Sequence, residues 1–189
     1  PHFLLNTLNN IYALIQFDAP KAQATVHDLS QLLRFALYDN QKDYVSLSKE
    51  IEFEERYVNL MRIRVPKTAD ISFTHTGEIK QDLQVMPLVY ISLIENAFKH
   101  GIRTNGEPCF IHIDLTVEHE SIIRFCIENS NYPKDDSDRS GSGIGLEQVQ
   151  KRLDLTYPGR YQWEKGVSAD ATTYHSHLII ETNPNKTIS

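Results

Sequence analysis

The sequence has few of the features that place a chain in a membrane, outside the cell or on nucleic acid. Its two cysteines, Cys109 and Cys126, have no metal-binding or redox spacing, so we expect a reducing compartment. No apolar run reaches the ~18 residues that cross a bilayer, and no signal peptide is recognisable. The net charge is −6, and there is no dense cluster of lysine and arginine, which argues against direct nucleic-acid binding.

The composition that remains is that of a globular protein. The chain has 189 residues, of which 40% are hydrophobic and 23% charged, which is enough for one large domain or two small ones. We predict a helical part over residues 1–66 and a mixed part over residues 67–189. Because no capping residue precedes Pro1, we expect the chain to be the C-terminal piece of a longer protein, with any membrane anchor upstream.

Three amphipathic helices are predicted in the helical part. The first runs to about Gln16, the second starts at Pro20, and the third follows the candidate cap Ser46. So few helices cannot bury their apolar stripes alone, so they need each other, the following domain or a second copy of the chain. A dimeric helical bundle is therefore expected.

Strands and helices do not strictly alternate in residues 67–189, which predicts an α+β sandwich with one mixed sheet covered by helices. Strands are predicted at 71–74, 110–117, 122–127, 161–167 and 173–181, and helices from Pro87 to about His100 and at 145–157.

The first ten residues, PHFLLNTLNN, have a polar side. Leu4 and Leu8 recur at helical spacing with Ile11 and Ile15, whereas His2, Asn6 and Asn9 fall on the opposite face. By itself this pattern is typical of a solvated helix face with a surface histidine.

The stretch PLVYISLIENAFKHG (residues 87–101) is an apolar helix with one continuous polar stripe: Ser92, Glu95, Asn96, Lys99 and His100. A salt-bridged surface stripe explains this pattern, with Glu95 and Lys99 as an i, i+4 pair. A nucleotide–metal site explains it equally well, because a carboxylate can take a proton, a carboxamide oxygen can bind Mg²⁺ and an ammonium can meet a phosphate.

A glycine-rich turn, GSGIGL (residues 141–146), leads into the next predicted helix. Glycine lets the backbone approach a ligand closely, and a helix N-terminus offers free N–H groups to phosphate oxygens. The turn is neither a Walker loop nor a dinucleotide fingerprint, and a flexible loop before a helix is the simpler interpretation. The polar stretch at 131–142 before it is either an ordinary loop or a lid over bound nucleotide.

Together these segments resemble a known set of motifs. PHFLLNTLNNI resembles the phosphoacceptor box of the LytS-like (autolysis-sensor type) two-component sensor histidine kinases. IENAFKHG and GSGIGL resemble the N-box and the glycine box of the GHKL (Bergerat) ATPase fold. The three motifs occur in the family's order and cover nearly the whole chain.

The resemblance implies a sensor kinase core in which the α+β domain binds Mg-ATP and His2, on a dimeric bundle, accepts the γ-phosphoryl group. Asn6 would position His2 or the phosphate, Asn96 would hold Mg²⁺, and Glu95 would orient the nucleophile or act as base. The remaining nucleotide contacts carried over from the family are Lys99, His100, Asn129, Gly141, Gly143, Gly145 and Leu146. The implied partners are a second copy of the chain and the receiver domain of a response regulator, in this family often of the LytTR type. The implied location is the cytoplasmic portion of an inner-membrane-anchored bacterial sensor.

The chain departs from the wider family at two positions. Phe3, rather than an acid, follows His2, as in other LytS-like members, so the base must come from elsewhere, such as Glu95. Asn129 stands where the fold usually has an aspartate that accepts a hydrogen bond from adenine. An uncharged acceptor forms the weaker bond, so we expect weaker ATP binding.

Two other functions compete with a kinase. A dimeric scaffold with a vestigial ATP site would not need Asn96 and the glycine box, and a protein-serine kinase of the same fold would not need the His2 helix. His175 and His177 share a strand face and could suggest a metal, but without a third ligand nearby in sequence a structural role is favoured.

Overall fold

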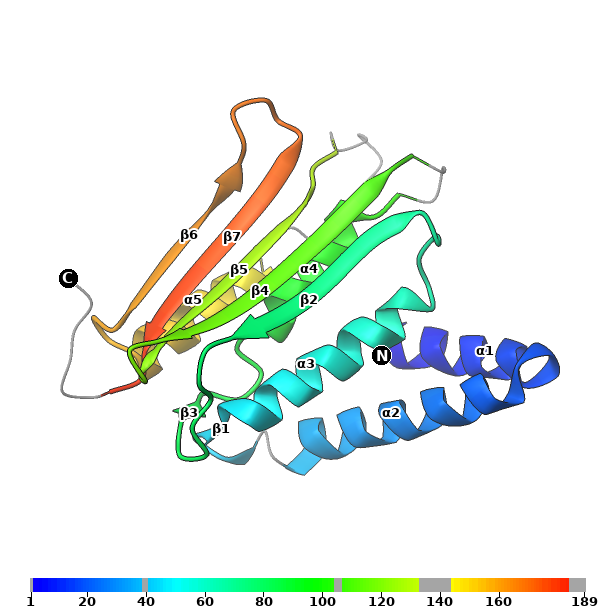
Figure 1. Cartoon of the computed structure of the whole chain (residues 1–189), viewed down its shortest axis with the longest axis horizontal. Coiled ribbons are helices and arrows are strands. Elements are labelled where there is room, and N and C mark those ends of the chain that lie inside the picture. The colour runs from blue at the N-terminus through cyan, green and yellow to red at the C-terminus, as the bar shows by residue number, and fades with distance from the viewer. Residues whose placement is uncertain (1, 39–40, 104–106, 133–143, 184–189) are drawn as a thin grey trace.

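A computed structural model describes residues 2–38, 41–103, 107–132 and 144–183 of the chain. Three helices come first: α1 (His2–Phe17), α2 (Ala19–Tyr38) and α3 (Leu47–Arg62). A five-stranded sheet follows, made of β2 (Ala69–Thr76), β4 (Cys109–Glu118), β5 (Ile122–Ser130), β6 (Tyr161–Val167) and β7 (Thr173–Glu181). Figure 1 shows the sheet with α1 and α2 set to one side of it.

The strand order is β2-β4-β5-β7-β6, and the sheet is mixed. β2 pairs with β4 in parallel, with Phe73 opposite Ile113, and all the other pairs in this sheet are antiparallel. The predicted α+β class with one mixed sheet is therefore confirmed. The strand bounds agree with the sequence pattern to within three residues, and those of β6 and β7 agree exactly.

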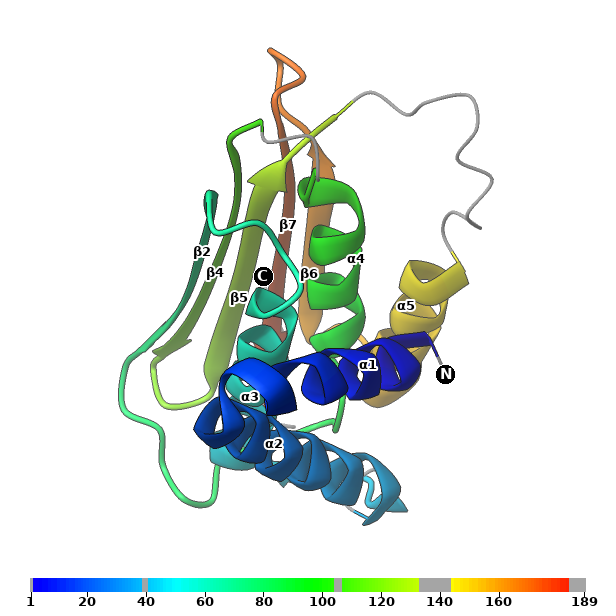
Figure 2. The same cartoon turned by 90° about the vertical axis from the view of Figure 1, so that its right-hand side faces the viewer.

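Helices α4 (Ile91–Gly101) and α5 (Ile144–Thr156) lie on one face of the sheet (Figure 2). The strand residues that point toward them, such as Ile111, Ile113 and Phe125, are fully buried, and Phe125 stacks on Tyr90 with ring centroids 4.2 Å apart. Alternate residues of the same strands are half-exposed or exposed, among them His112 and Asp114. Burial with period two is expected when only one face of a sheet is covered.

Helix α3 connects the helical part to the sheet. It contacts α2 as well as β2, β3 (Gln84–Val85) and α4. Ser46 stands at its N-cap as predicted, but its side chain makes no capping hydrogen bond. Ser46 and Val45 form the short strand β1 (Val45–Ser46), which pairs with β3; this pairing is too short to show periodicity and was not predicted.

The helix expected to open at Pro87 begins four residues later, at Ile91. Residues 87–90 form a turn instead, and Leu88 has a φ of 56°, which a right-handed helix does not allow. The helix start expected from the proline was therefore wrong.

The apolar stripe of α1 is only partly buried. Ile11 is buried, but Leu8 is 47% exposed and Ile15 is 57% exposed. Further apolar side chains on α1 and α2 are exposed as well: Leu5, Tyr12, Phe17, Val26, Leu33, Leu37 and Tyr38. One copy of the chain thus leaves much of the apolar surface of α1 and α2 in water.

Candidate functional site

The polar stripe predicted on α4 is present. Leu93, Ile94, Ala97 and Phe98 are buried against the core, while Ser92, Asn96 and His100 are half-buried and Glu95 and Lys99 are exposed. The helix therefore presents a carboxylate, a carboxamide, an ammonium and an imidazole along one side. These are the groups that the sequence predicted to lie together.

The turn before α4 is held by side chains from two other elements. The buried carboxylate of Glu50, on α3, accepts hydrogen bonds from the backbone N–H groups of Leu88 and Val89, both at 3.0 Å. The guanidinium of Arg152, on α5, donates to the carbonyls of Pro87 at 2.7 Å and Leu88 at 3.4 Å. Because buried backbone groups need partners, these bonds let the chain enter α4 without a regular helical first turn.

Glu50 and Glu54 form a buried pair of carboxyl groups one turn apart on α3. Burial raises the pKa of Glu50 to about 7, against the lowering effect of its backbone hydrogen bonds and of Arg152. Burial also raises the pKa of Glu54, and the neighbouring Glu50 and Glu95 raise it further. Within the described residues the Glu54 oxygens and the Tyr90 hydroxyl have no hydrogen-bond partner. Burial beside a second carboxyl group therefore favours the protonated form of Glu54.

Glu95 stands on the polar stripe of α4. Desolvation by the surrounding protein raises the pKa of its carboxyl group, although the side chain reaches the surface. A raised pKa makes a carboxylate a better proton acceptor near neutral pH. Its chemistry is that of a candidate base.

Asn129 lies at the end of β5 and is 1% exposed. Its amide Nδ2 donates to the Ser130 carbonyl at 2.9 Å, whereas its Oδ1 has no partner in the described part of the chain. Gly101, the last residue of α4, approaches it so closely that an added Cβ would lie 2.8 Å from the Asn129 Cβ. The strand end and the end of α4 thus meet at an unsatisfied hydrogen-bond acceptor.

The glycine-rich turn is described only in part. Gly141 and Gly143, like most of the predicted lid, lie outside the described residues. Gly145 and Leu146 lie in the first turn of α5, with Leu146 packed against the core. The backbone N–H groups of such a first turn have no intrahelical partners and are suited to bind phosphate oxygens.

His2 is the first residue of α1, and Asn6 follows one turn later, half-buried. These two predicted residues are thus on the helical part, and the other described ones are on α4, β5 and α5.

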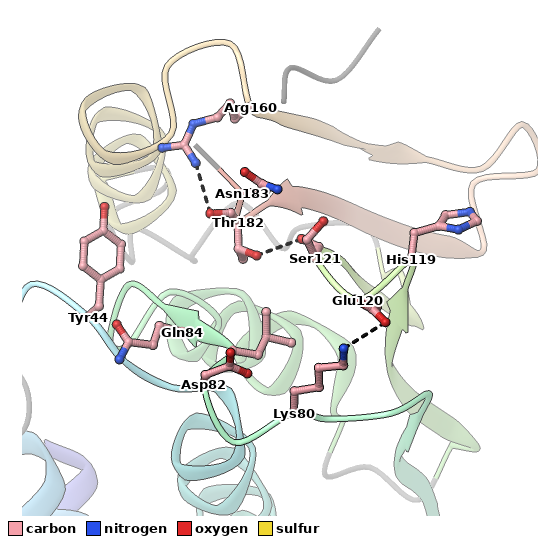
Figure 3. A pocket seen from close by; sticks show the side chains of 11 residues that line it. Tyr44, Lys80, Asp82, Gln84, His119, Glu120, Ser121, Arg160, Thr182 and Asn183 are labelled. Atoms are coloured by element: carbon pink, nitrogen blue, oxygen red, sulfur yellow. Dashed lines mark hydrogen bonds and ion pairs between the residues drawn. The ribbon is translucent and has the colours of Figure 1, made fainter. Parts of the chain in front are cut away.

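Figure 3 shows a cavity of about 510 Å³ that none of the predicted site residues lines. Its wall includes Lys80 and Glu120, which form an ion pair of 2.8 Å, and Arg160, which donates to the carbonyls of Thr156, Glu181 and Thr182. Ser121 stands just before β5, so at ~3.3 Å per residue the cavity lies roughly 25 Å from Asn129. The cavity and the predicted site are at opposite ends of the sheet.

Among the described residues, no three His, Cys, Asp or Glu side chains are arranged to hold a metal ion. The rings of His175 and His177 lie 5.3 Å apart, and His177 Nε2 is 3.8 Å from a Glu128 carboxylate oxygen. Nor is any described helix both long and apolar enough to cross a bilayer.

Sequence reasoning missed Glu50, Arg152 and Gly101. Glu50 and Arg152 bond to residues of the turn that lie 38 and at least 64 positions away in the sequence. A local sequence pattern does not predict such contacts. The glycine that closes IENAFKHG was a visible signal for a close backbone approach.

Comparison with known proteins agrees with the geometry. A family model described as histidine kinase matches residues 1–69. The sensor protein LytS of Staphylococcus haemolyticus is 28% identical over 192 residues, which cover 96% of this chain and 33% of that protein. The sensor protein LytS of Staphylococcus saprophyticus is 30% identical over 164 residues. These residues cover 82% of this chain and 28% of that protein.

Among solved structures, full-length ShkA in complex with AMPPNP is similar in fold. The TM-score is 0.53 at 12% identity, and the match covers 87% of this chain and 39% of ShkA. The chain thus spans about a third of the curated relatives, and the structural likeness concerns the fold.

Proposed function

Because the chain belongs to the LytS-like histidine kinases, we propose that it is the catalytic core of a sensor histidine kinase that phosphorylates His2 from ATP. The observation that supports this most directly is the buried Oδ1 of Asn129, which has no partner among the described residues, since a buried acceptor in a native protein normally has a donor. The exocyclic amino group of adenine is such a donor. The ATP analogue in the ShkA structure supports nucleotide binding by this fold.

The residues present suit ATP with Mg²⁺. Mg²⁺ bound with phosphates needs few protein ligands, so one carboxamide oxygen, that of Asn96, is sufficient without a carboxylate cluster. Lys99 and His100 on the same stripe would meet the phosphates and the ribose. The backbone of Gly141, Gly143 and Gly145, followed by Leu146, would close on the phosphates.

Bound Mg-ATP supplies the phosphoryl group and neutralises part of its charge. The chain's own residues would hold the adenine ring at Asn129 and orient the phosphates along α4. Glu95, with its raised pKa, takes the proton that the His2 imidazole releases. Asn6, one turn after His2, positions the imidazole or the phosphate.

A second copy of the chain is the partner that suits the exposed apolar residues of α1 and α2. We propose a homodimer through this surface, and transfer of the phosphoryl group to an aspartate of a response regulator of the LytTR type. By analogy with LytS sensors, the chain would be the cytoplasmic portion of an inner-membrane protein. The buried Oδ1 of Asn129, which has no partner within the described residues, and the polar stripe of α4 favour an active kinase over a degenerate scaffold.

Transfer of label from ATP labelled at the γ-phosphate tests the proposal. The protein is expected to acquire label that is stable in base and lost in acid, and His2→Gln is expected to abolish it. Label retained in His2→Gln, or label that resists acid, would reject phosphorylation of His2.

A further inference from the structure

The polar stripe of α4 can serve a nucleotide only if the helix has the right rotation and height. Apolar packing decides which side of α4 faces outward, and its buried residues are Leu93, Ile94, Ala97, Phe98 and Gly101. Groups that act on a substrate need a finer setting, to within about 0.5 Å and 10–20°. An anchor at the start of α4 would set Glu95 and Asn96 together, because both lie within two turns of it.

The start of α4 is not fixed by a capping side chain. Tyr90 occupies the N-cap position, and its side chain makes no capping hydrogen bond within the described residues. Leu88, two residues earlier, has a φ of 56°, a left-handed conformation that leucine adopts only where its surroundings hold it. The segment that leads into α4 therefore depends on contacts from other elements.

Glu50 of α3 holds the N–H side of this turn. Its side chain is fully buried, and its two carboxylate oxygens accept hydrogen bonds from consecutive backbone N–H groups, Oε2 from Leu88 and Oε1 from Val89, both at 3.0 Å. Two bonds to one planar group fix the direction of the peptide segment as well as its position.

Arg152 of α5 holds the carbonyl side of the same turn. Its guanidinium donates to the carbonyl oxygens of Pro87 at 2.7 Å and Leu88 at 3.4 Å. Leu88 is thus bonded through its N–H group to α3 and through its carbonyl to α5. Helices α4 and α5 also contact each other on the same face of the sheet (Figure 2). The left-handed residue before α4 is therefore held from two sides.

Glu54 shows that burial alone does not place a carboxyl group on the turn. It lies one turn after Glu50 on α3 and is 1% exposed. Within the described residues, however, neither of its oxygens has a hydrogen-bond partner. The two buried acids of α3 thus differ in one respect, which is that Glu50 is bonded to the turn.

We propose that Glu50 and Arg152 are positioning residues, which hold the turn at residues 87–90 and thereby align the polar stripe of α4 with the phosphates of the nucleotide. The inference rests on the proposed function, since it says how the same site is aligned. Neither side chain has to touch the nucleotide. Asn129 belongs to β5, outside this turn, so loss of these bonds should slow phosphoryl transfer more than it weakens ATP binding.

Glu50→Gln tests the proposal. Glutamine has nearly the same shape, but it offers one acceptor oxygen and turns an N–H donor toward the second backbone N–H group. The rate of autophosphorylation at saturating ATP should fall at least about tenfold, while the ATP concentration that gives half of this rate should change less than about threefold. Transfer of label from ATP labelled at the γ-phosphate measures both quantities.

Glu54→Gln is the matched control, because it removes a buried carboxyl group from the same helix without touching the turn. It should keep the rate of the unmodified protein. Thermal unfolding of each variant identifies those that fail to fold. A full rate in Glu50→Gln, or an equal loss of rate in both folded variants, would overturn the proposal.

Arg152→Met decides the matter if Glu50→Gln does not fold, since Arg152 is only half-buried. It should lower the rate at saturating ATP at least about threefold, whereas Lys151→Met, at the exposed neighbouring position, should not. An unchanged rate in folded Arg152→Met would overturn the proposal.

The unmodified protein separates this inference from the proposed function. If it acquires no label from ATP, the proposed function fails. If it acquires label on His2 and the folded variants do so at the same rate, only the positioning role of Glu50 and Arg152 fails.

Discussion

The two ends of the five-stranded sheet use polar groups in opposite ways. At one end, around the cavity, the guanidinium of Arg160 donates hydrogen bonds to three backbone carbonyls, and Lys80 forms an ion pair with Glu120. At the other end, a buried oxygen of Asn129 has no partner in the part of the chain that the structure describes, and the polar stripe of α4 faces outward. The two largest cations of the hollow end thus have partners, whereas the other end holds a buried acceptor without one among the described residues. A ligand gains more from an acceptor that lacks a partner than from a hollow whose polar groups already have partners.

The largest effect expected from this comparison is on catalysis. Asn96→Ala should lower the rate of autophosphorylation by at least about a hundredfold, because it removes a group that orients the phosphates and the metal. Its melting temperature should stay close to that of the unmodified protein, since the side chain is half-exposed. Gln84→Ala, a carboxamide removed at the cavity instead, is the control and should leave the rate unchanged. A similar loss of rate in both variants would break the comparison.

Arg160→Met should affect stability and spare the nucleotide site. It leaves three carbonyls without their donor, which we expect to cost about 2–3 kcal/mol in the free energy of unfolding. Urea unfolding measures this loss, and ATP affinity measured under native conditions should not change. A stability loss within error of zero would show that the cavity end is not held by these bonds.

Glu54→Gln should change how stability depends on pH. The pKa of Glu54 is raised in the folded state, so the unfolded chain binds fewer protons between pH 4.5 and that higher value. The folded protein is therefore most stable below this range and loses stability as the pH rises through it. Glutamine removes this contribution. The stability of the variant relative to that of the unmodified protein should therefore rise from pH 5 to pH 8.

Thermal unfolding at the two pH values measures the change, with Glu52→Gln, on the exposed side of α3, as the control. A pH dependence as steep in Glu54→Gln as in the unmodified protein would show that Glu54 is ionised in the fold.

The smallest effect is expected at the cavity ion pair. Lys80→Ala should leave both the melting temperature and ATP affinity unchanged within error, because an exposed ion pair contributes little and is screened by salt. A measurable fall in ATP affinity would connect the two ends of the sheet and contradict their independence.

Most of the fold follows from patterns that span a few residues. The alternation in β4 and β5 and the stripe on α4 give the sheet, its covered face and the side of the helix that carries the polar groups. The same patterns misplace the start of α4, since Pro87 resembles a helix start. The turn that replaces it depends on Glu50, 38 residues away from Leu88.

The candidate site likewise contains residues that the sequence predicts and features that it does not. Asn96 and Glu95 could be recognised from helical spacing alone, whereas the state of Asn129 depends on the direction of the Ser130 carbonyl and on the closeness of Gly101. Likewise, periodicity identifies the apolar residues of α1 but not which of them another part of the chain covers. Contacts between distant segments decide these matters, and no short stretch of sequence encodes them.

The turn before α4 joins segments that lie far apart in the sequence. Its N–H groups are bonded to α3 through Glu50, its carbonyls to α5 through Arg152, and the Met86 N–H to the Tyr157 hydroxyl at 2.7 Å. Helix α3 and the end of α5 are thus hydrogen-bonded to one short segment, which continues directly into α4. Helix α3 also contacts α2, so this one segment joins the helical part of the chain to the two helices that cover the sheet.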